Sequence, residues 1–350
     1  MRAMRIFPRL TLASLLALSL GTAACGGGSS GSDDVGDEPA AEGAAGGSSG
    51  ASGWTFTDDN GVTHTLDAAP ETVVAQSTIA GGLWEYGVDV AGVFGPLRYA
   101  DGTPDPAIGL ADPEDFESLG EVDSEINVEA LAALRPDLII APSWGPGPGD
   151  YWGIAPDSVE TLEQIAPIVA IRVDGRPLDE PLARVGELAA SFGDEEAEAV
   201  DAARGEFDAA STRFSDAVAA KPGLTVLAAS GTLTEFYVAY PPGFPDLSYF
   251  ASLGLDMVEP TEHPEAGGYW QTLSWEEVGM YPADMVLADV REGSIDFLLD
   301  QMPASGLQLP AVQAGQMVAW PAASAVGYGS AAAVLDTLTG SVEAADTSIV

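Results

Sequence analysis

"LDEPLARVGELAASFGDEEAEAVDAARGEFDAASTRFSDAVAAK" occupies residues 178–221 and shows no strand-like alternation of apolar and polar residues. Its larger apolar residues recur mainly at helical spacings, at Leu182, Val185, Leu188, Phe192, Val200, Phe207, Phe214 and Val218. Such spacings place apolar side chains on one face of an α-helix. We therefore predict a helical connection over 178–221, with Gly193 as the point where it would kink or split.

On both sides of this connection, short apolar runs alternate with helical patterns. The runs before it include "ETVVAQS" (71–77) and "DLIIAPS" (137–143), and those after it include "GLTVLAAS" (223–230) and "ADMVLADV" (283–290). Continuous apolar runs between helices are typical of parallel sheets covered by helices. We predict an α/β protein with two Rossmann-like lobes and parallel sheets, over 54–177 and 222–345. The first lobe should open with a β-hairpin that turns at 59–61.

The N-terminal residues have the pattern of an export signal. Three arginines precede the apolar run "LTLASLLALSL" (10–20), and small residues follow up to Cys25, the one cysteine of the chain. This arrangement resembles a bacterial lipobox, so we predict a lipoprotein signal peptide over 1–24 and lipidation of Cys25. Ordinary cleavage in the same alanines, with Cys25 unmodified, is the alternative. Residues 25–53 are rich in Gly, Ser, Ala and acids, which predicts a disordered tether.

The composition excludes several classes of function. Twelve basic and 54 acidic residues give a formal net charge of −42, which argues against nucleic-acid binding. The acidity is interpreted as a solvated surface, with a field that steers ligands as the alternative. Two histidines, His64 and His263, leave little for a metal cage, so we predict no metal site. An exported α/β hydrolase is disfavoured because the sequence has no G-x-S-x-G elbow.

Aromatic and arginine residues follow several of the predicted strands. In open α/β sheets, ligands bind beyond the carboxyl ends of the strands. Packing of the rings in the core or between the lobes, and salt bridges for the arginines, are the alternatives. The predicted ligand-binding residues are Arg98, Trp144, Tyr151, Trp152, Tyr237, Tyr240, Tyr269, Trp270, Arg291 and Tyr328.

An ordered set of segments resembles a known family. The segments are "ALAALRPDLIIAPSW" (130–144), "LEQIAPIVAI" (162–171), "YFASLGLDMVEP" (249–260), "SWEEVGMYPADMVLADV" (274–290) and "LPAVQAGQMVAW" (309–320). They are similar to landmarks of the helical-backbone substrate-binding proteins of ABC importers, which serve ferric siderophores, haem and cobalamin. The resemblance extends over nearly all of 54–340.

The resemblance implies that the two lobes clamp a ligand and that the connecting helix limits their closure. It implies capture of a ferric siderophore, an iron chelate that needs no protein cofactor, and delivery to an ABC permease and ATPase complex. Glu160 and Glu276 would dock the permease by position. We expect a monomer that is extracytoplasmic and held at the cell membrane by its lipid. Cobalamin and haem remain alternatives, and haem would need His263 or a tyrosine pair.

Overall fold

The computed structural model describes residues 53–145, 149–262 and 268–350. The predicted signal peptide, Cys25 and nearly all of the predicted tether lie outside these residues, as does His263. No helix within the described ranges is long and apolar enough to cross a membrane.

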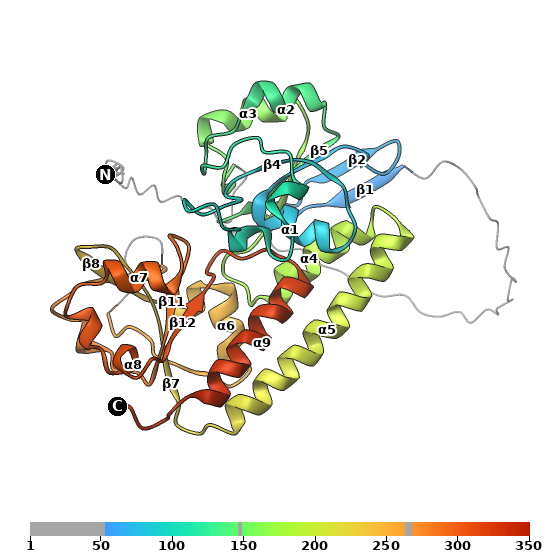
Figure 1. Ribbon diagram of the computed structural model, residues 1–350. Coiled ribbons are helices and arrows are strands. Elements are labelled where there is room, and N and C mark those ends of the chain that lie inside the picture. The colour runs from blue at the N-terminus through green and yellow to red at the C-terminus, as the bar shows by residue number, and fades with distance from the viewer. Residues whose placement is uncertain (1–52, 146–148, 263–267) are drawn as a thin grey trace, which may run out of the picture. The chain divides into compact units, whose positions relative to one another are not determined.

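The first lobe is built on a parallel sheet, as predicted (Figure 1). An antiparallel hairpin of β1 (Trp54–Thr57) and β2 (Thr63–Leu66) precedes it and confirms the predicted turn. The sheet has the strand order β4-β3-β5-β6, and all three of its pairings are parallel. Its strands are β3 (Val73–Gln76), β4 (Val90–Phe94), β5 (Leu138–Ser143) and β6 (Ile168–Arg172), and its helices are α1 (Ser77–Glu85), α2 (Val128–Leu134) and α3 (Val159–Glu163).

The second lobe has a mixed sheet, which corrects the prediction of a parallel one. Its strand order is β10-β8-β7-β11-β12, with β9 paired to β7. The strands β8 and β10 were not predicted, and each runs antiparallel to the strand beside it. The strands are β7 (Thr225–Gly231), β8 (Glu235–Ala239), β9 (Asp256–Met257), β10 (Trp270–Ser274), β11 (Met285–Asp289) and β12 (Met317–Trp320), and the helices are α6 (Pro245–Ser252), α7 (Ile295–Gln301) and α8 (Pro310–Gln313).

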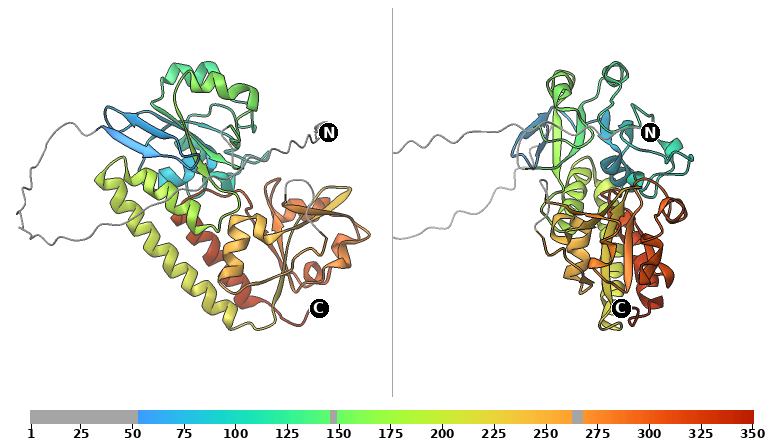
Figure 2. Two further views of the ribbon diagram at one scale, coloured as in Figure 1. Left: turned by 180° about the vertical axis from the view of Figure 1, so that it is seen from behind. Right: turned by 90° about the vertical axis from the view of Figure 1, so that its left-hand side faces the viewer.

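The predicted helical connection consists of two helices, α4 (Asp179–Ala190) and α5 (Asp194–Ala219). The chain breaks at 191–193, with Gly193 as the residue before α5, where a split had been allowed for. Three acidic residues in the first turn of α5 favour a helix start because they face the positive end of its dipole. Helix α4 packs on α1 and β6 of the first lobe, whereas α5 lies along the C-terminal helix α9 (Tyr328–Ala344) (Figures 1 and 2).

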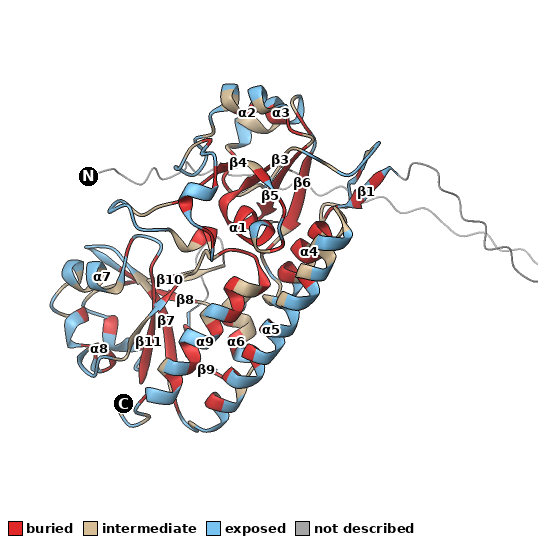
Figure 3. Cartoon of the chain, turned by 45° about the vertical axis from the view of Figure 1, so that its right-hand side comes forward, coloured by how far each residue is buried: buried red, intermediate tan, exposed pale blue. Residues whose placement is uncertain are grey.

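The two lobes share an apolar core on the side of these helices. One continuous cluster contains Val73 and Leu138 of the first sheet, Val226 of the second sheet, and Leu335 of α9. The strands β3, β5 and β11 are buried, while α5 and α9 expose their outer faces (Figure 3). This shared core ties the lobes together and is consistent with small relative movement.

Helix α1 also approaches the segment before α9 very closely. A Cβ atom at Gly82 would lie only 2.1 Å from the carbonyl oxygen of Val326, so no side chain fits there. The backbone N–H of Val326 donates to the carbonyl of Thr78 at 2.8 Å. Glycine at position 82 is therefore required for this contact between the lobes.

The first lobe supplies the N-terminal cap of α9. Gly327, the residue before the helix, has no side chain with which to cap it. Instead, the Glu85 carboxylate accepts hydrogen bonds from the N–H groups of Gly329 at 2.8 Å and Ser330 at 2.9 Å, and from the Ser330 hydroxyl. The Tyr86 hydroxyl accepts a further one from the N–H of Tyr328 at 2.9 Å. These groups would otherwise be unsatisfied donors of the first helical turn.

The turn of the N-terminal hairpin is tied to the rest of the first lobe through Asp59. Its carboxylate accepts hydrogen bonds from the backbone N–H of Arg172 at 2.8 Å and from the guanidinium groups of Arg176 at 3.2 Å and Arg184 at 2.9 Å. The Asp59 side chain is only 8% exposed. The hairpin turn, β6 and α4 therefore meet at one buried carboxylate.

Candidate ligand-binding site

Aromatic rings from both lobes meet at the ends of the sheets. The ring centroid of Trp144, directly after β5, lies 5.7 Å from that of Trp152 and 5.4 Å from that of Tyr269 in the second lobe. These contacts bring three of the predicted residues together across the lobes.

The second lobe extends this group of rings. Trp270, at the start of β10, packs on Phe244 at 5.0 Å and on Trp320 at 5.9 Å between centroids, and Tyr237 of β8 lies 6.3 Å from it. Together these rings form an interlobe aromatic cluster of Trp144, Trp152, Tyr237, Phe244, Tyr269, Trp270 and Trp320. Offset and edge-to-face geometries of this kind favour aromatic packing.

Arg291 lies beside the cluster and is held by an acid. Its Nε atom donates to both carboxylate oxygens of Asp289 at 3.0 Å, and its Nη2 atom donates to Oδ2 at 2.6 Å. Its Cζ atom lies 6.0 Å from the centroid of the Trp270 ring, within range of a cation–π contact. Arg291 thus lies at the cluster, but the guanidinium nitrogens that could hold an anionic ligand already bind the Asp289 carboxylate.

Three other predicted residues lie elsewhere or contact the cluster only through the backbone. Arg98 is paired with Glu114 at 2.6 Å, and among the described residues it shares no hydrogen bond, ion pair or ring contact with the cluster. Tyr151 packs on the apolar core beneath α2 and α3. Tyr240 donates its backbone N–H to the carbonyl of Tyr269 at 2.8 Å.

Tyr328 is a core residue of the helical side of the molecule. It is 3% exposed, and its ring lies 5.5 Å from Phe207 and 5.2 Å from the Arg204 guanidinium carbon. The structure therefore does not bring Tyr328 to the interlobe aromatic cluster. Its place at the start of a helix, between Gly327 and Gly329, gave no indication of this burial.

Several residues of the site could not be recognised in the sequence. The Tyr99 hydroxyl donates to the carbonyl of Val290 at 2.7 Å and so links the lobes. Trp320 ends an apolar strand and was not among the predicted site residues, yet it contacts Trp270 in the cluster.

Carboxylates near the cluster have altered acidity. Burial raises the pKa of Asp246 to about 6, against the opposing effect of the hydrogen bond that it accepts from the Trp320 indole at 2.5 Å. Loss of hydration also raises the pKa of Asp123, although Trp152 and the charge of Arg291 act in the other direction. Among the described residues, no group of three or more His, Cys, Asp or Glu side chains could hold a metal ion.

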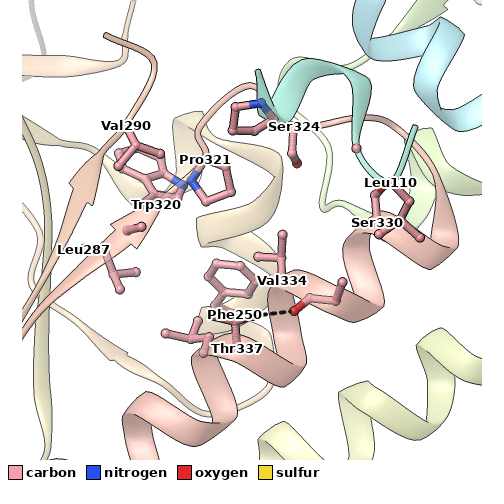
Figure 4. A pocket seen from close by; sticks show the side chains of 15 residues that line it. Leu110, Phe250, Leu287, Val290, Trp320, Pro321, Ser324, Ser330, Val334 and Thr337 are labelled. Carbon is pink, nitrogen blue, oxygen red and sulfur yellow. Dashed lines mark hydrogen bonds between the residues drawn. The ribbon is translucent and has the colours of Figure 1, made fainter. Parts of the chain in front are cut away.

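A separate cavity of about 290 Å³ adjoins the cluster (Figure 4). It is mostly apolar, and its walls come from β11, β12, α6 and α9 and from residues 106–110 of the first lobe. Trp320 belongs to both the cavity and the aromatic cluster. Phe250 and Val334 line the wall away from the strands in Figure 4.

The two predicted docking acids are exposed on different lobes. Glu160 lies in the first turn of α3, and Glu276 follows β10. The neighbouring Glu277 is engaged locally, because its carboxylate accepts hydrogen bonds from the Ser274 N–H at 3.1 Å and hydroxyl at 2.8 Å. Glu276 is therefore the better placed of the two neighbours for contact with another protein.

Two α/β lobes with a shared helical side and a ring-lined junction define a two-lobe binding protein. The family model described as periplasmic binding protein matches residues 111–323. The chain is 39% identical to DesE, a ferric-siderophore receptor protein from Streptomyces coelicolor, with a TM-score of 0.78, over 84% of this chain and 99% of that one. The chain belongs to this periplasmic binding protein family.

More distant structures share the fold. The petrobactin-binding protein YclQ from Bacillus subtilis is 16% identical with a TM-score of 0.62, over 83% of this chain and 99% of its own. FhuD from Vibrio cholerae, solved with Fe³⁺-Desferal, is 22% identical with a TM-score of 0.57, over 79% of this chain and 99% of its own. The search of curated proteins found no match.

Proposed function

We propose that this chain is an extracytoplasmic solute-binding protein that captures a ferric siderophore between its lobes and delivers it to an ABC importer. The observation that carries the proposal is the interlobe aromatic cluster in a chain 39% identical to a ferric-siderophore receptor. Ligand sites typically combine apolar walls with a few polar groups. Trp144, Tyr269 and Arg291 provide this combination.

A ferric siderophore suits this set of residues because the chelator fills the coordination sphere of the metal. No histidine is then required from the protein. His64 is engaged in the hairpin, where its Nε2 atom is 3.0 Å from the Asp58 carboxylate. The ligand would take the place of the contact between Trp144 and Tyr269, so the lobes must part slightly to admit it. Haem and cobalamin are the alternatives for the same fold.

Trp270→Ala should weaken ligand binding by about 1 to 3 kcal/mol, because this ring is a central member of a desolvated cluster. Binding is measured by fluorescence quenching with a panel of ferric siderophores, haem and cobalamin. Trp84→Ala is the matched control, since Trp84 is 38% exposed on α1 and belongs to no part of the cluster. Tight binding of haem or cobalamin, with no siderophore bound by the wild type, would contradict the proposal.

We also propose that Cys25 is lipidated and anchors the protein as a monomer to the outer face of the cell membrane. The position of the cysteine between an apolar run and a Gly/Ser-rich segment supports this. Cys25→Ala should abolish incorporation of labelled fatty acid and release the protein from the membrane fraction. Ser29→Ala, in the same segment, should change neither. An unlabelled wild-type protein would show that the anchor is absent.

Glu160 and Glu276 are proposed to dock the permease. Their exposure and their positions on separate lobes support this role. Charge-assisted contacts at an interface favour orientation and encounter. The permease and ATPase would then recognise the relative position of the two lobes.

A further inference from the structure

Trp320 is the most buried member of the interlobe aromatic cluster, with an exposed fraction of 1%. Its ring centroid lies 5.1 Å from that of Phe244 and 5.9 Å from that of Trp270. Trp270 in turn is half-buried and lies beside the Arg291 guanidinium. Trp320 therefore supports the ring that the proposed ligand would contact, and a shift of Trp320 would remove that support.

Packing alone does not hold the Trp320 ring against the cluster. The ring also lines the cavity of about 290 Å³, together with Phe250 and Val334 (Figure 4). Atoms that border a void have no partner on that side and lose those van der Waals contacts. An apolar cavity of about 150 Å³ is enough to bind benzene. The cavity beside Trp320 therefore has room for an indole ring that leaves the cluster.

The carboxylate of Asp246 supplies the directional contact that packing lacks. The Trp320 indole N–H donates to Oδ2 of Asp246 at 2.5 Å. The other oxygen, Oδ1, accepts the backbone N–H of Leu247 at 2.8 Å and so fixes the carboxylate within the first turn of α6. An indole has a single polar hydrogen, so the bond to Asp246 uses the one donor through which the ring can be oriented.

The segment that carries Asp246 is also tied to the connection between the lobes. Phe244, two residues earlier, packs on Trp270 and belongs to the cluster. The carbonyl of Pro245 accepts the backbone N–H of Leu178, the residue before α4, at 3.0 Å. The Asp246 carboxylate therefore projects from backbone that is held both by the cluster and by the interlobe connection.

We propose that Asp246 is a positioning residue of the ligand site, whose hydrogen bond holds Trp320 against Trp270 and so keeps the cluster in the arrangement that receives the ferric siderophore. This rests on the proposed function and specifies how its site is regulated. Asp246 itself does not contact the ligand. Without the hydrogen bond, Trp320 enters the cavity and Trp270 loses its support. The apparent affinity then falls with the fraction of molecules in which the cluster is assembled.

The acidity of Asp246 makes this arrangement sensitive to pH. Burial raises its pKa to about 6 against the hydrogen bonds from Trp320 and Leu247, and the charge of Asp289 raises the pKa further. Asp289 is itself paired with Arg291, whose own pKa is raised by both carboxylates. Below its pKa Asp246 is neutral, and a hydrogen bond to a neutral acceptor is about half as strong. Affinity should therefore fall by about three- to tenfold as pH drops through this pKa.

The test is a pH profile of ligand binding. Dissociation constants are measured by fluorescence quenching between about pH 5 and about pH 8, with Fe³⁺-Desferal and the rest of the ferric-siderophore panel. Asp246→Asn should weaken binding by about three- to tenfold at the upper end and give a flat profile, because asparagine is neutral throughout.

Trp320→Phe tests the same bond from the donor side. Phenylalanine keeps an aromatic ring but has no N–H group, so this variant should also give a flat profile. Asp246→Asn should add nothing in the Trp320→Phe background, because the bond is already absent there. Circular dichroism shows whether each variant is folded, and Trp320→Phe carries the test if Asp246→Asn is not.

Asp296→Asn is the matched control, because Asp296 is an exposed acid in the first turn of α7, another helix of the same lobe. It should keep the affinity and the pH profile of the wild type. If the affinity of the wild type does not fall near the pKa of Asp246, or if either cluster variant keeps that fall, the inference is overturned and the siderophore function stands. If the wild type binds no ferric siderophore but binds haem or cobalamin, the proposed function itself is overturned.

Discussion

Glu85→Ala should lower the free energy of unfolding by about 2 to 4 kcal/mol. The substitution leaves the N–H groups of Gly329 and Ser330, and the hydroxyl of Ser330, without their acceptor. These donors lie where α1 of the first lobe meets α9, so water cannot replace the carboxylate freely. Denaturant unfolding followed by circular dichroism measures the loss.

Glu198→Ala is the control for this variant, since Glu198 is exposed within α5 and alanine favours helices. It should leave stability nearly unchanged. Glu85→Gln keeps one acceptor and should be intermediate. A Glu85→Ala variant as stable as the wild type would show that α9 does not depend on this cap.

The difference in free energy of unfolding between the wild type and Glu85→Ala should change with pH in a defined direction. Burial raises the pKa of Glu85 above the ordinary value of 4.5, and the hydrogen bonds from Ser330 and Gly329 offset only part of the rise. The folded protein therefore binds this proton more tightly than the unfolded chain. The associated stabilisation is fully present below the unfolded pKa and is lost as pH rises through the folded pKa. The difference in free energy of unfolding between the wild type and Glu85→Ala should therefore become smaller as pH rises.

Replacing both Glu160 and Glu276 with alanine should abolish uptake of the ligand by cells while leaving its dissociation constant unchanged. The two carboxylates are exposed on separate lobes, away from the interlobe aromatic cluster. Loss of both would remove the proposed charge-assisted contacts to the permease, which set orientation. Uptake of labelled iron and in vitro binding are measured on the same variant.

A second pair of exposed acids provides the control. Glu206 on α5 and Glu343 on α9, both changed to alanine, remove the same charge from other surfaces. Cells with the Glu206/Glu343 variant should take up labelled iron as the wild type does. Normal uptake by the Glu160/Glu276 variant would exclude these residues from docking, and weakened ligand binding would indicate a role within the lobes instead.

The sequence allowed the parallel parts of the fold to be predicted, because buried parallel strands are continuous apolar runs. "DLIIAPS" and "ADMVLADV" form β5 and β11 as expected. The strands β8 and β10 were missed because each alternates buried residues with exposed or half-buried ones, such as Glu235 and Trp270. Antiparallel strands that border a site alternate polar and aromatic residues and so resemble loops in sequence.

The site could be predicted only in part, because it depends on side-chain direction and distant contacts. Trp144, Tyr269 and Trp270 meet in the cluster, yet Tyr151 points to the core beneath α2 and α3 although it follows the same strand. Tyr99 becomes part of the site only because the fold brings its hydroxyl to the carbonyl of Val290. Neither residue type nor local spacing reveals such a pairing.

The position of Asp59 also has a mechanical consequence. A pulling force applied at residue 54 enters the fold through β1, which pairs with β2 alone. A free two-stranded hairpin would peel away under such a load. Because Arg172, Arg176 and Arg184 hold the Asp59 carboxylate, the force is shared with β6 and α4. If the proposed anchor is correct, these contacts help the two lobes to stay folded when the membrane-bound protein is pulled at its N-terminal end.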